Sequence, residues 1–204
     1  MMTKTFEQLP TTAISDALKG KNHLPATIKP LEPHYVVSGR AVTVKLPIYE
    51  NGAVMEAMLQ ASPGDVLVVD IQNDTTRAVA GDFVLAMMKK LQIAGLVVYG
   101  AIRDVEAAKQ LDFPIFVTGT TVAAGVKNGG GKVNVPLTIE KTTIQPGDLI
   151  VGDADGVVVV PFEIVDEVFE GAKEKIKKDT LREQTVLESV ATIKAHLSQV
   201  TSKF

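Results

Sequence analysis

Three charged side chains stand where apolar runs give way to helical patterns. Arg103 and Asp104 come shortly after the apolar run Leu96–Tyr99, and a helical-looking segment begins directly behind them. Asp82 follows Gly81 and also precedes a helical pattern. A guanidinium supplies a permanent positive charge with directed donors, and a carboxylate can hold a hard divalent cation or move a proton. Together these residue types suit the stabilisation of a developing oxyanion.

Both aspartates also have a purely structural explanation. Asp82 and Asp104 could each cap the helix that follows, and Arg103 could pair with a nearby carboxylate. Yet the carboxyl ends of strands in an α/β sheet form the crevice in which ligands bind. A helix N-terminus there offers free N–H groups to an anion, and Gly81 permits close backbone approach. Spacing and placement leave two interpretations open: the loop Arg77–Asp82 cradles a small carboxylate, or the aspartates only cap.

Strand and helix patterns alternate through the first half of the chain, and these elements must position the charged residues. Continuous apolar runs bounded by turn residues predict buried strands, and apolar residues at helical spacing predict helices. The predicted helices cover 11–19, 53–61, 83–93 and 104–111, and the predicted strands cover 36–46, 66–69, 96–99 and a segment beginning at 114. From 133 to 160 the pattern indicates strands and turns alone, and a long amphipathic helix with one break follows over about 163–200. We therefore expect a single α/β domain over residues 1–204.

Composition excludes several classes of function. The 204 residues are 46% hydrophobic and 22% charged with a net charge of −3, so we expect no nucleic-acid partner. The absence of cysteine removes disulfides, zinc–thiolate sites and a thiol nucleophile. The first six residues lack the apolar core of a signal peptide, and no apolar run approaches the roughly 20 residues of a membrane span. These features predict a cytoplasmic protein with no membrane partner.

Other motifs have simpler explanations. The stretch GVKNGGGK, residues 125–132, lacks the Ser or Thr that a phosphate loop needs after Gly-Lys, so it predicts a flexible loop. Asp153–Gly156 predicts a hairpin turn rather than a calcium loop. The segment 63–70 resembles 146–153, since in both a Pro-Gly-Asp turn starts an apolar strand that ends in aspartate. The three histidines show no metal-ligand spacing.

Asp82, twenty residues and then Arg103-Asp104 form a D-x20-R-D pattern. Around it lie the blocks PGDVLVVD, AGLVVYGAIRDVEAAKQLDFPIFVTGTT, VNVPLTI and PGDLIVGDADGVVVVP, in this order. Over roughly residues 10–180 the chain resembles the RraA-like family, and the pattern resembles that of its class II pyruvate aldolases, which act on 4-hydroxy-4-methyl-2-oxoglutarate and 4-carboxy-4-hydroxy-2-oxoadipate. The resemblance implies a β/β/α sandwich that forms homotrimers or homohexamers, with active sites between subunits.

The resemblance also implies roles for individual residues. Asp104 would bind a divalent metal, usually Mg²⁺ or Mn²⁺, and Arg103 would hold the keto oxygen of the pyruvate part of the substrate. Asp82 would act on a water at the metal, and the backbone around Gly81, Asp82, Phe83 and Val84 would take the carboxylate. Carbon–carbon cleavage leaves a pyruvate enolate, and oxaloacetate decarboxylation passes through the same enolate, so one site would do both. No Schiff-base lysine is needed.

A third acidic residue would come from the C-terminal helix of a neighbouring subunit. By position it is Asp179, where the family usually has glutamate, and the aspartate side chain is one methylene shorter. Glu174 and Glu183 lie about one helical turn away on similar faces and remain alternatives.

Two other functions compete with a metal-dependent lyase. The first is a non-catalytic regulator that resembles the ribonuclease E inhibitor RraA, a branch that lacks the aspartate after the arginine. This chain keeps Arg103, Asp104 and Asp82, which favours catalysis. The second is the demethylmenaquinone methyltransferase function attached to similar sequences, but the first half of the chain has no glycine-rich G-x-G nucleotide loop. The substrate, the metal and the choice between trimer and hexamer stay open.

Overall fold

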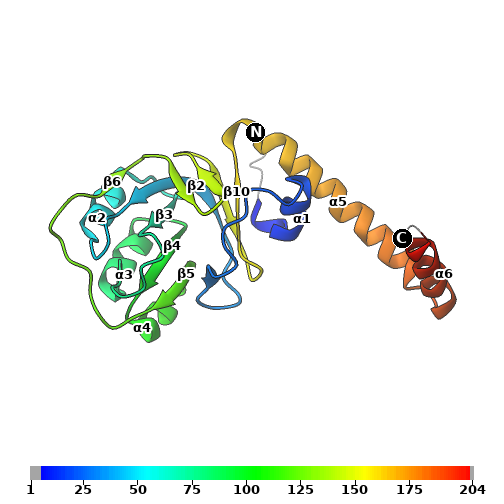
Figure 1. The fold of residues 1–204 in the computed structure, drawn as a ribbon, viewed down its shortest axis with the longest axis horizontal. Coiled ribbons are helices and arrows are strands. Elements are labelled where there is room, and N and C mark those ends of the chain that lie inside the picture. The colour runs from blue at the N-terminus through cyan, green and yellow to red at the C-terminus, as the bar shows by residue number, and fades with distance from the viewer. Residues whose placement is uncertain (1–5, 203–204) are drawn as a thin grey trace.

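A sheet with a parallel centre organises the protein, as the computed structural model of residues 6–202 shows (Figure 1). The central strands lie in the order β5-β4-β3-β2, with helices in the connections between them. The strands are β2 (Val37–Lys45), β3 (Val66–Asp70), β4 (Gly95–Ile102) and β5 (Ile115–Thr120), and the helices are α2 (Gly52–Gln60), α3 (Asp82–Lys90) and α4 (Val105–Gln110). Every helix and strand predicted for this half is present, so the α/β class is confirmed.

Antiparallel strands extend the sheet at both ends. β2 is shared, since its first half pairs with β9 and its second half pairs with β3. The remaining strands are β1 (Lys29–Pro30), β6 (Lys132–Val133), β7 (Leu137–Ile139), β8 (Thr142–Ile144), β9 (Leu149–Gly152) and β10 (Val157–Val160). The order β1-β5-β4-β3-β2-β9-β10, with β6 beside β2 and a separate β7-β8 hairpin, confirms strands and turns between 133 and 160.

Two apolar cores lie against this sheet. The larger one joins the central strands to α2 and α3, whose buried side chains include Val54 and Leu85. The smaller one joins β9 and β10 to the short helix α1 (Thr11–Ala17) and to the C-terminal helix, through Ile14, Val160 and Val168. A 3-10 turn, Phe6–Gln8, precedes α1. The layered arrangement agrees with the predicted β/β/α sandwich.

The two Pro-Gly-Asp segments form the same turn. Gly64 and Gly147 both have a φ of 89°, the left-handed region that a glycine in this position of a turn adopts. The Asp65 carboxylate accepts the N–H of Ser62 at 2.8 Å, and Asp148 accepts the N–H of Gln145 at 2.8 Å. Equal turn chemistry therefore accounts for the similarity of the two segments.

Strand β4 is longer than its sequence pattern predicts. The apolar run suggested an end at Tyr99, but pairing with β5 continues through a register shift to Ile102. A Cβ at position 100 would lie 2.3 Å from Cγ2 of Ile71, so only glycine can continue the strand there. Gly100 is therefore part of the strand, and Arg103 follows its last residue.

The C-terminal helix is divided once, as expected. A 3-10 turn, Phe162–Ile164, leads into α5 (Val165–Val186), and α6 (Val190–Thr201) follows. Ser189 has extended backbone and starts α6 with a capping box, in which its hydroxyl and that of Thr192 each accept the other residue's N–H. The first part of α5 packs beside α1, and the rest of α5 with α6 extends beyond the sheet (Figure 1).

Within residues 6–202, no helix combines the length and the apolar character that crossing a membrane requires. Residues 1–5 and 203–204 are outside the described part of the chain. The expectation of no signal peptide rests largely on residues 1–5, so it stays a prediction, as does a single domain spanning 1–204.

Asp153 ties α1 to the β9–β10 hairpin, and its loss should destabilise the protein. Its carboxylate accepts the Thr11 N–H at 2.8 Å and the Thr11 hydroxyl at 2.7 Å. We expect Asp153→Ala to lower the free energy of unfolding by about 1–2 kcal/mol in urea titrations. The matched control is Asp155→Ala, whose exposed side chain should matter by less than about 0.5 kcal/mol. Equal effects of the two variants would contradict the assignment.

Candidate functional site

The three charged residues of the D-x20-R-D pattern meet where β4 ends and α3 begins. The Arg103 N–H donates to the carbonyl oxygen of Ala80 at 3.0 Å, which pairs the two segments. The Asp104 carboxylate oxygen Oδ2 lies 3.2 Å from Nε of Arg103 and accepts the Asp82 N–H at 3.3 Å. Asp82 and Asp104, which are 22 positions apart in sequence, are thus in direct contact.

Gly81 makes this contact possible. A Cβ at position 81 would lie 2.4 Å from Oδ2 of Asp104 and 3.0 Å from Nε of Arg103. Both separations are below van der Waals contact, so any side chain would push the charged pair away. The sequence suggested that Gly81 permits close approach, and the structure identifies the approaching groups as these two side chains.

Asp104 does not cap the helix that follows it. It occupies the N-cap position of α4 in left-handed conformation, with φ 60° and ψ 45°, and makes no side-chain cap hydrogen bond. Aspartate tolerates this conformation better than most residues. Its carboxylate instead contacts the first N–H of the other helix, α3. The simple capping interpretation of Asp104 is therefore wrong.

Asp82 is the first residue of α3, and Gly81 occupies the N-cap position. The Asp82 carboxylate accepts the Phe83 N–H at 2.7 Å, so it does satisfy one free N–H group of the helix end. The N–H of Val84 belongs to the same first turn, whose N–H groups have no intrahelical partner. A ligand carboxylate at this turn would use Val84 directly and would compete with Asp82 for Phe83.

Two cavities adjoin at Arg103. One has a volume of about 340 Å³ and contains Asp104; its lining residues are Arg103, Asp104, Val105, Thr120, Thr121 and Val122. The other, of about 200 Å³, we call the α3 cavity because the first turn of α3 forms one wall. Its lining residues are Asn51, Ala78, Ala80, Gly81, Asp82, Phe83, Val84, Arg103, Ala124, Gly125 and Lys127. Arg103 and the predicted carboxylate-binding residues Gly81–Val84 therefore share one cavity.

Asn51 and Lys127 were not singled out from the sequence. The Asn51 side chain is only 8% exposed, and its Oδ1 has no hydrogen-bond partner within the described chain. A buried unpaired polar atom on a cavity wall is available to a ligand. Lys127 belongs to the predicted glycine-rich loop, and the loop is confirmed over 125–131. Asn51 precedes a helix, where asparagine is usually a cap, so local sequence offered no signal for either residue.

The three candidates for the further acidic residue lie on α5, away from both cavities of this protomer. Lys175 donates to the Asp179 carboxylate, and Arg182 lies 3.0 Å from it. The Lys175 hydrogen bond holds the pKa of Asp179 below its ordinary value. Glu174 lies 3.6 Å from Lys178, and Glu183 is exposed. A role for any of them at this site would require a second subunit.

Asp104 has the properties of a single-carboxylate ligand for a hard cation. Its side chain is 37% exposed, and Oδ1 makes no hydrogen bond within residues 6–202. No group of three or more His, Cys, Asp or Glu side chains that could enclose a metal occurs in the same residues. Mg²⁺ keeps several waters and is usually held by one or two carboxylates, so the donors present fit such an ion.

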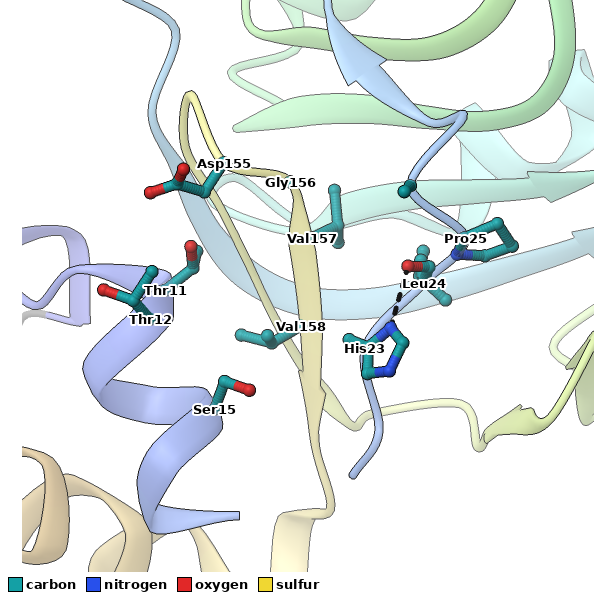
Figure 2. Close-up of a pocket in the computed structure, with 11 residues that line it drawn as sticks. Thr11, Thr12, Ser15, His23, Leu24, Pro25, Asp155, Gly156, Val157 and Val158 are labelled. Atoms are coloured by element: carbon teal, nitrogen blue, oxygen red, sulfur yellow. Dashed lines mark hydrogen bonds between the residues drawn. The ribbon is translucent and has the colours of Figure 1, made fainter. Parts of the chain in front are cut away.

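A further cavity, of about 240 Å³, lies elsewhere in the molecule (Figure 2). The hydroxyl-bearing residues Thr11, Thr12 and Ser15 line it from α1, and His23 lies on the opposite side. Nδ1 of His23 is 3.2 Å from the carbonyl oxygen of Leu24. None of the predicted site residues lines this cavity, so it has no part in the candidate chemistry.

The close approach at Gly81 can be tested by filling the space. We expect Gly81→Ala to displace the Arg103–Asp104 pair and to lower the free energy of unfolding by less than about 1 kcal/mol, because the atoms that must move belong to half-exposed, flexible side chains. A crystal structure of the variant and urea titration would measure the two effects. Gly119→Ala is the matched control, because a Cβ there would lie 3.4 Å from Cγ2 of Thr75, an ordinary contact. An unmoved pair in Gly81→Ala would contradict the steric argument.

Comparisons with known proteins identify relatives that match most of the chain. A protein of Halalkalibacterium halodurans, named "Putative 4-hydroxy-4-methyl-2-oxoglutarate aldolase", is 52% identical over 195 residues, which are 96% of this chain and 93% of that protein. The crystal structure of Streptomyces coelicolor RraAS2, described as an unusual member of the RNase ES inhibitor RraA family, has a TM-score of 0.80 at 27% identity and covers 88% of this chain and 94% of that one. The RNA-processing inhibitor RraA from Thermus thermophilis has a TM-score of 0.70 at 27% identity, over 76% and 93% of the two chains.

The family model described as RraA-like, Aldolase/RraA, matches residues 11–159. This segment contains the central sheet and the contact between Gly81, Arg103 and Asp104. The chain therefore belongs to the RraA-like family of aldolases and RraA proteins.

Proposed function

We propose that this protein is a divalent-metal-dependent class II aldolase, a lyase that cleaves 4-hydroxy-2-oxo acids such as 4-hydroxy-4-methyl-2-oxoglutarate to pyruvate. The same site would decarboxylate oxaloacetate through the same pyruvate enolate. One observation carries the proposal: Arg103, Asp104 and the first turn of α3 converge around Gly81 beside a cavity. The name of the relative at 52% identity supports the substrate class.

The α3 cavity supplies donors for the carboxylate of the pyruvate half. The Val84 N–H belongs to the first turn of α3, where the helix dipole favours an anion. Phe83 joins it when the ligand displaces the Asp82 carboxylate, and Lys127 adds a positive charge to the lining of the cavity. Arg103 lines the same cavity and would donate to the keto oxygen, where its charge stabilises the enolate as it forms.

Asp104 would hold the cation, Mg²⁺ or Mn²⁺, with waters completing the shell. A divalent cation at this position would act as a Lewis acid toward the enolate oxygen. Asp82 is exposed beside Arg103 and would accept the proton of the substrate hydroxyl through an intervening water. In the aldol substrate this proton transfer accompanies cleavage of the carbon–carbon bond, whereas oxaloacetate loses carbon dioxide and leaves the same enolate.

We propose that the site is completed in a homotrimer or homohexamer. Phe83 beside the α3 cavity is 72% exposed, and Val122 beside Asp104 is 93% exposed. A subunit interface would cover both of these apolar side chains. A second subunit would also bring α5 and Asp179 to this site, which one protomer keeps away from it.

A second candidate is a non-catalytic regulator that binds a protein partner such as ribonuclease E. Structural similarity to two proteins described as RraA supports it. The presence of both Arg103 and Asp104 in contact favours the lyase. Absence of turnover in folded, metal-supplied protein would favour the regulator.

Pyruvate release tests the proposed function. We expect turnover of oxaloacetate and of 4-hydroxy-4-methyl-2-oxoglutarate with Mg²⁺ present, and its loss in excess chelator. Arg103→Ala and Asp104→Ala should each lower turnover by at least about 100-fold, because each removes charge stabilisation of the enolate. Circular dichroism should show an unchanged fold. Glu106→Gln, an exposed change on α4, is the control and should retain activity. Retention of activity in either alanine variant would refute the assignment.

The third acidic residue can be identified by comparison of two variants on α5. We expect Asp179→Ala to lower turnover more than Glu183→Ala, measured with the same two substrates. Both residues lie on the same helix, so a general effect on α5 would appear in both variants. A larger loss in Glu183→Ala would transfer the role to that residue.

A further inference from the structure

Glu50 is an acidic residue buried behind the α3 cavity. Its side chain is 3% exposed, and it does not line the cavity itself. Oε1 accepts the N–H of Asn51 at 3.1 Å and that of Gly52 at 2.9 Å, and Oε2 accepts the N–H of Asn128 at 2.8 Å. One carboxylate therefore binds the start of α2 and the glycine-rich loop together.

The two segments that Glu50 joins also pair directly. The Val126 N–H donates to the carbonyl oxygen of Tyr49 at 2.7 Å, and the Asn51 N–H donates to the carbonyl oxygen of Val126 at 2.9 Å. Tyr49 has a φ of 71°, a conformation that non-glycine residues rarely adopt. The residue directly before Glu50 therefore has an unfavourable backbone conformation.

The carboxylate is ionised at neutral pH. The Gly52 N–H contributes most, and together with those of Asn128 and Asn51 it holds the pKa of Glu50 below its ordinary value against the opposing effect of burial. Hydrogen bonds to an ionised acceptor are stronger than those between neutral groups. The three hydrogen bonds that join the start of α2 to the glycine-rich loop are therefore stronger than bonds to a neutral acceptor would be.

The hydrogen bonds of Glu50 reach the backbone at or beside Asn51 and Lys127, the two cavity residues that the sequence did not reveal. The backbone N–H of Asn51 donates to the Glu50 carboxylate. Lys127 directly precedes Asn128, whose N–H donates to the same carboxylate. Asn51 and Lys127 both line the α3 cavity. A shift of the loop relative to α2 would change the separation of these two side chains.

We propose that Glu50 is a positioning residue that holds Asn51 and Lys127 in place on the wall of the α3 cavity. The inference rests on the proposed function, because it assigns the charge of Lys127 to the carboxylate of a 2-oxo acid, while the unpaired Oδ1 of Asn51 can accept from a hydroxyl or a water in the same cavity. Glu50 acts through them and does not touch the substrate.

A double-mutant cycle of Glu50→Gln and Lys127→Ala separates positioning from a general structural role. Glutamine has nearly the same shape but replaces one acceptor oxygen with a donor, so at least one of the three hydrogen bonds is lost. We expect Glu50→Gln to raise KM for oxaloacetate about tenfold with a smaller change in kcat. In a protein that already carries Lys127→Ala, Glu50→Gln should raise KM much less, because the charge that Glu50 positions is already absent.

Two measurements that need no turnover accompany the cycle. Hydrogen exchange should be faster at 125–131 in Glu50→Gln, and calorimetry should show weaker binding of oxalate, an analogue of the enolate, in the presence of Mg²⁺. Glu56→Gln is the matched control, since it removes the same charge from the exposed side of α2 and should change neither quantity. Glu50→Asp, which keeps the charge but is one methylene shorter, replaces Glu50→Gln if that variant does not fold.

The outcomes distinguish failure of this inference from failure of the proposed function. Faster loop exchange with unchanged KM and unchanged oxalate affinity would overturn the inference, because Glu50 would then be structural only. Fully additive effects in the cycle would also overturn it. A wild-type protein that binds oxalate without turnover would refute the lyase, while weaker oxalate binding in Glu50→Gln would still support the role of Glu50.

Discussion

The candidate site depends on the close approach of a glycine backbone to a charged pair. Gly81 leaves room for Asp104 and Arg103 at distances that no Cβ would permit. Because of this approach, the Asp104 carboxylate reaches the first N–H of α3, and the guanidinium lies beside the same helix end. A carboxylate, a guanidinium and free N–H groups are thereby gathered within one small region. In the proposed function the carboxylate would hold the cation, the guanidinium would contact the keto oxygen and the N–H groups would bind the substrate carboxylate.

The sheet supplies the rigidity that this contact needs. β3 and β4 are neighbours, and their carboxyl ends lie at the same edge. Gly100 allows β4 to continue to Ile102, so Arg103 emerges at the level where the chain enters α3. The hydrogen bond from Arg103 to Ala80 then fixes the two connections relative to each other. Side chains held on strand and helix ends are placed more firmly than side chains on free loops.

Another part of the α3 cavity lining is built differently. Asn51 and Lys127 come from irregular segments, and a buried carboxylate with backbone hydrogen bonds replaces the sheet as their support. Gly125 contributes as well, since a Cβ there would lie 3.0 Å from Cγ of Asn51. Part of the lining is thus fixed by strand pairing, and part is fixed by hydrogen bonds to the ionised side chain of Glu50.

The sequence by itself determined the order of the helices and of the central strands β2 to β5, the α/β class and the three charged residues of the D-x20-R-D pattern. Local periodicity and turn residues encode these features, because each depends on neighbours within one or two turns of chain. Only the tertiary structure decided that Asp104 contacts α3 rather than capping α4, that β4 passes through Gly100, and that Asn51 and Lys127 share a cavity with Arg103. These outcomes depend on which distant backbones come within a few ångströms of each other. The identity of the groups that approach Gly81, the close contact at Gly100 and the single hydrogen bond that the Asn128 N–H donates to Glu50 across 78 positions leave no local signature in the chain.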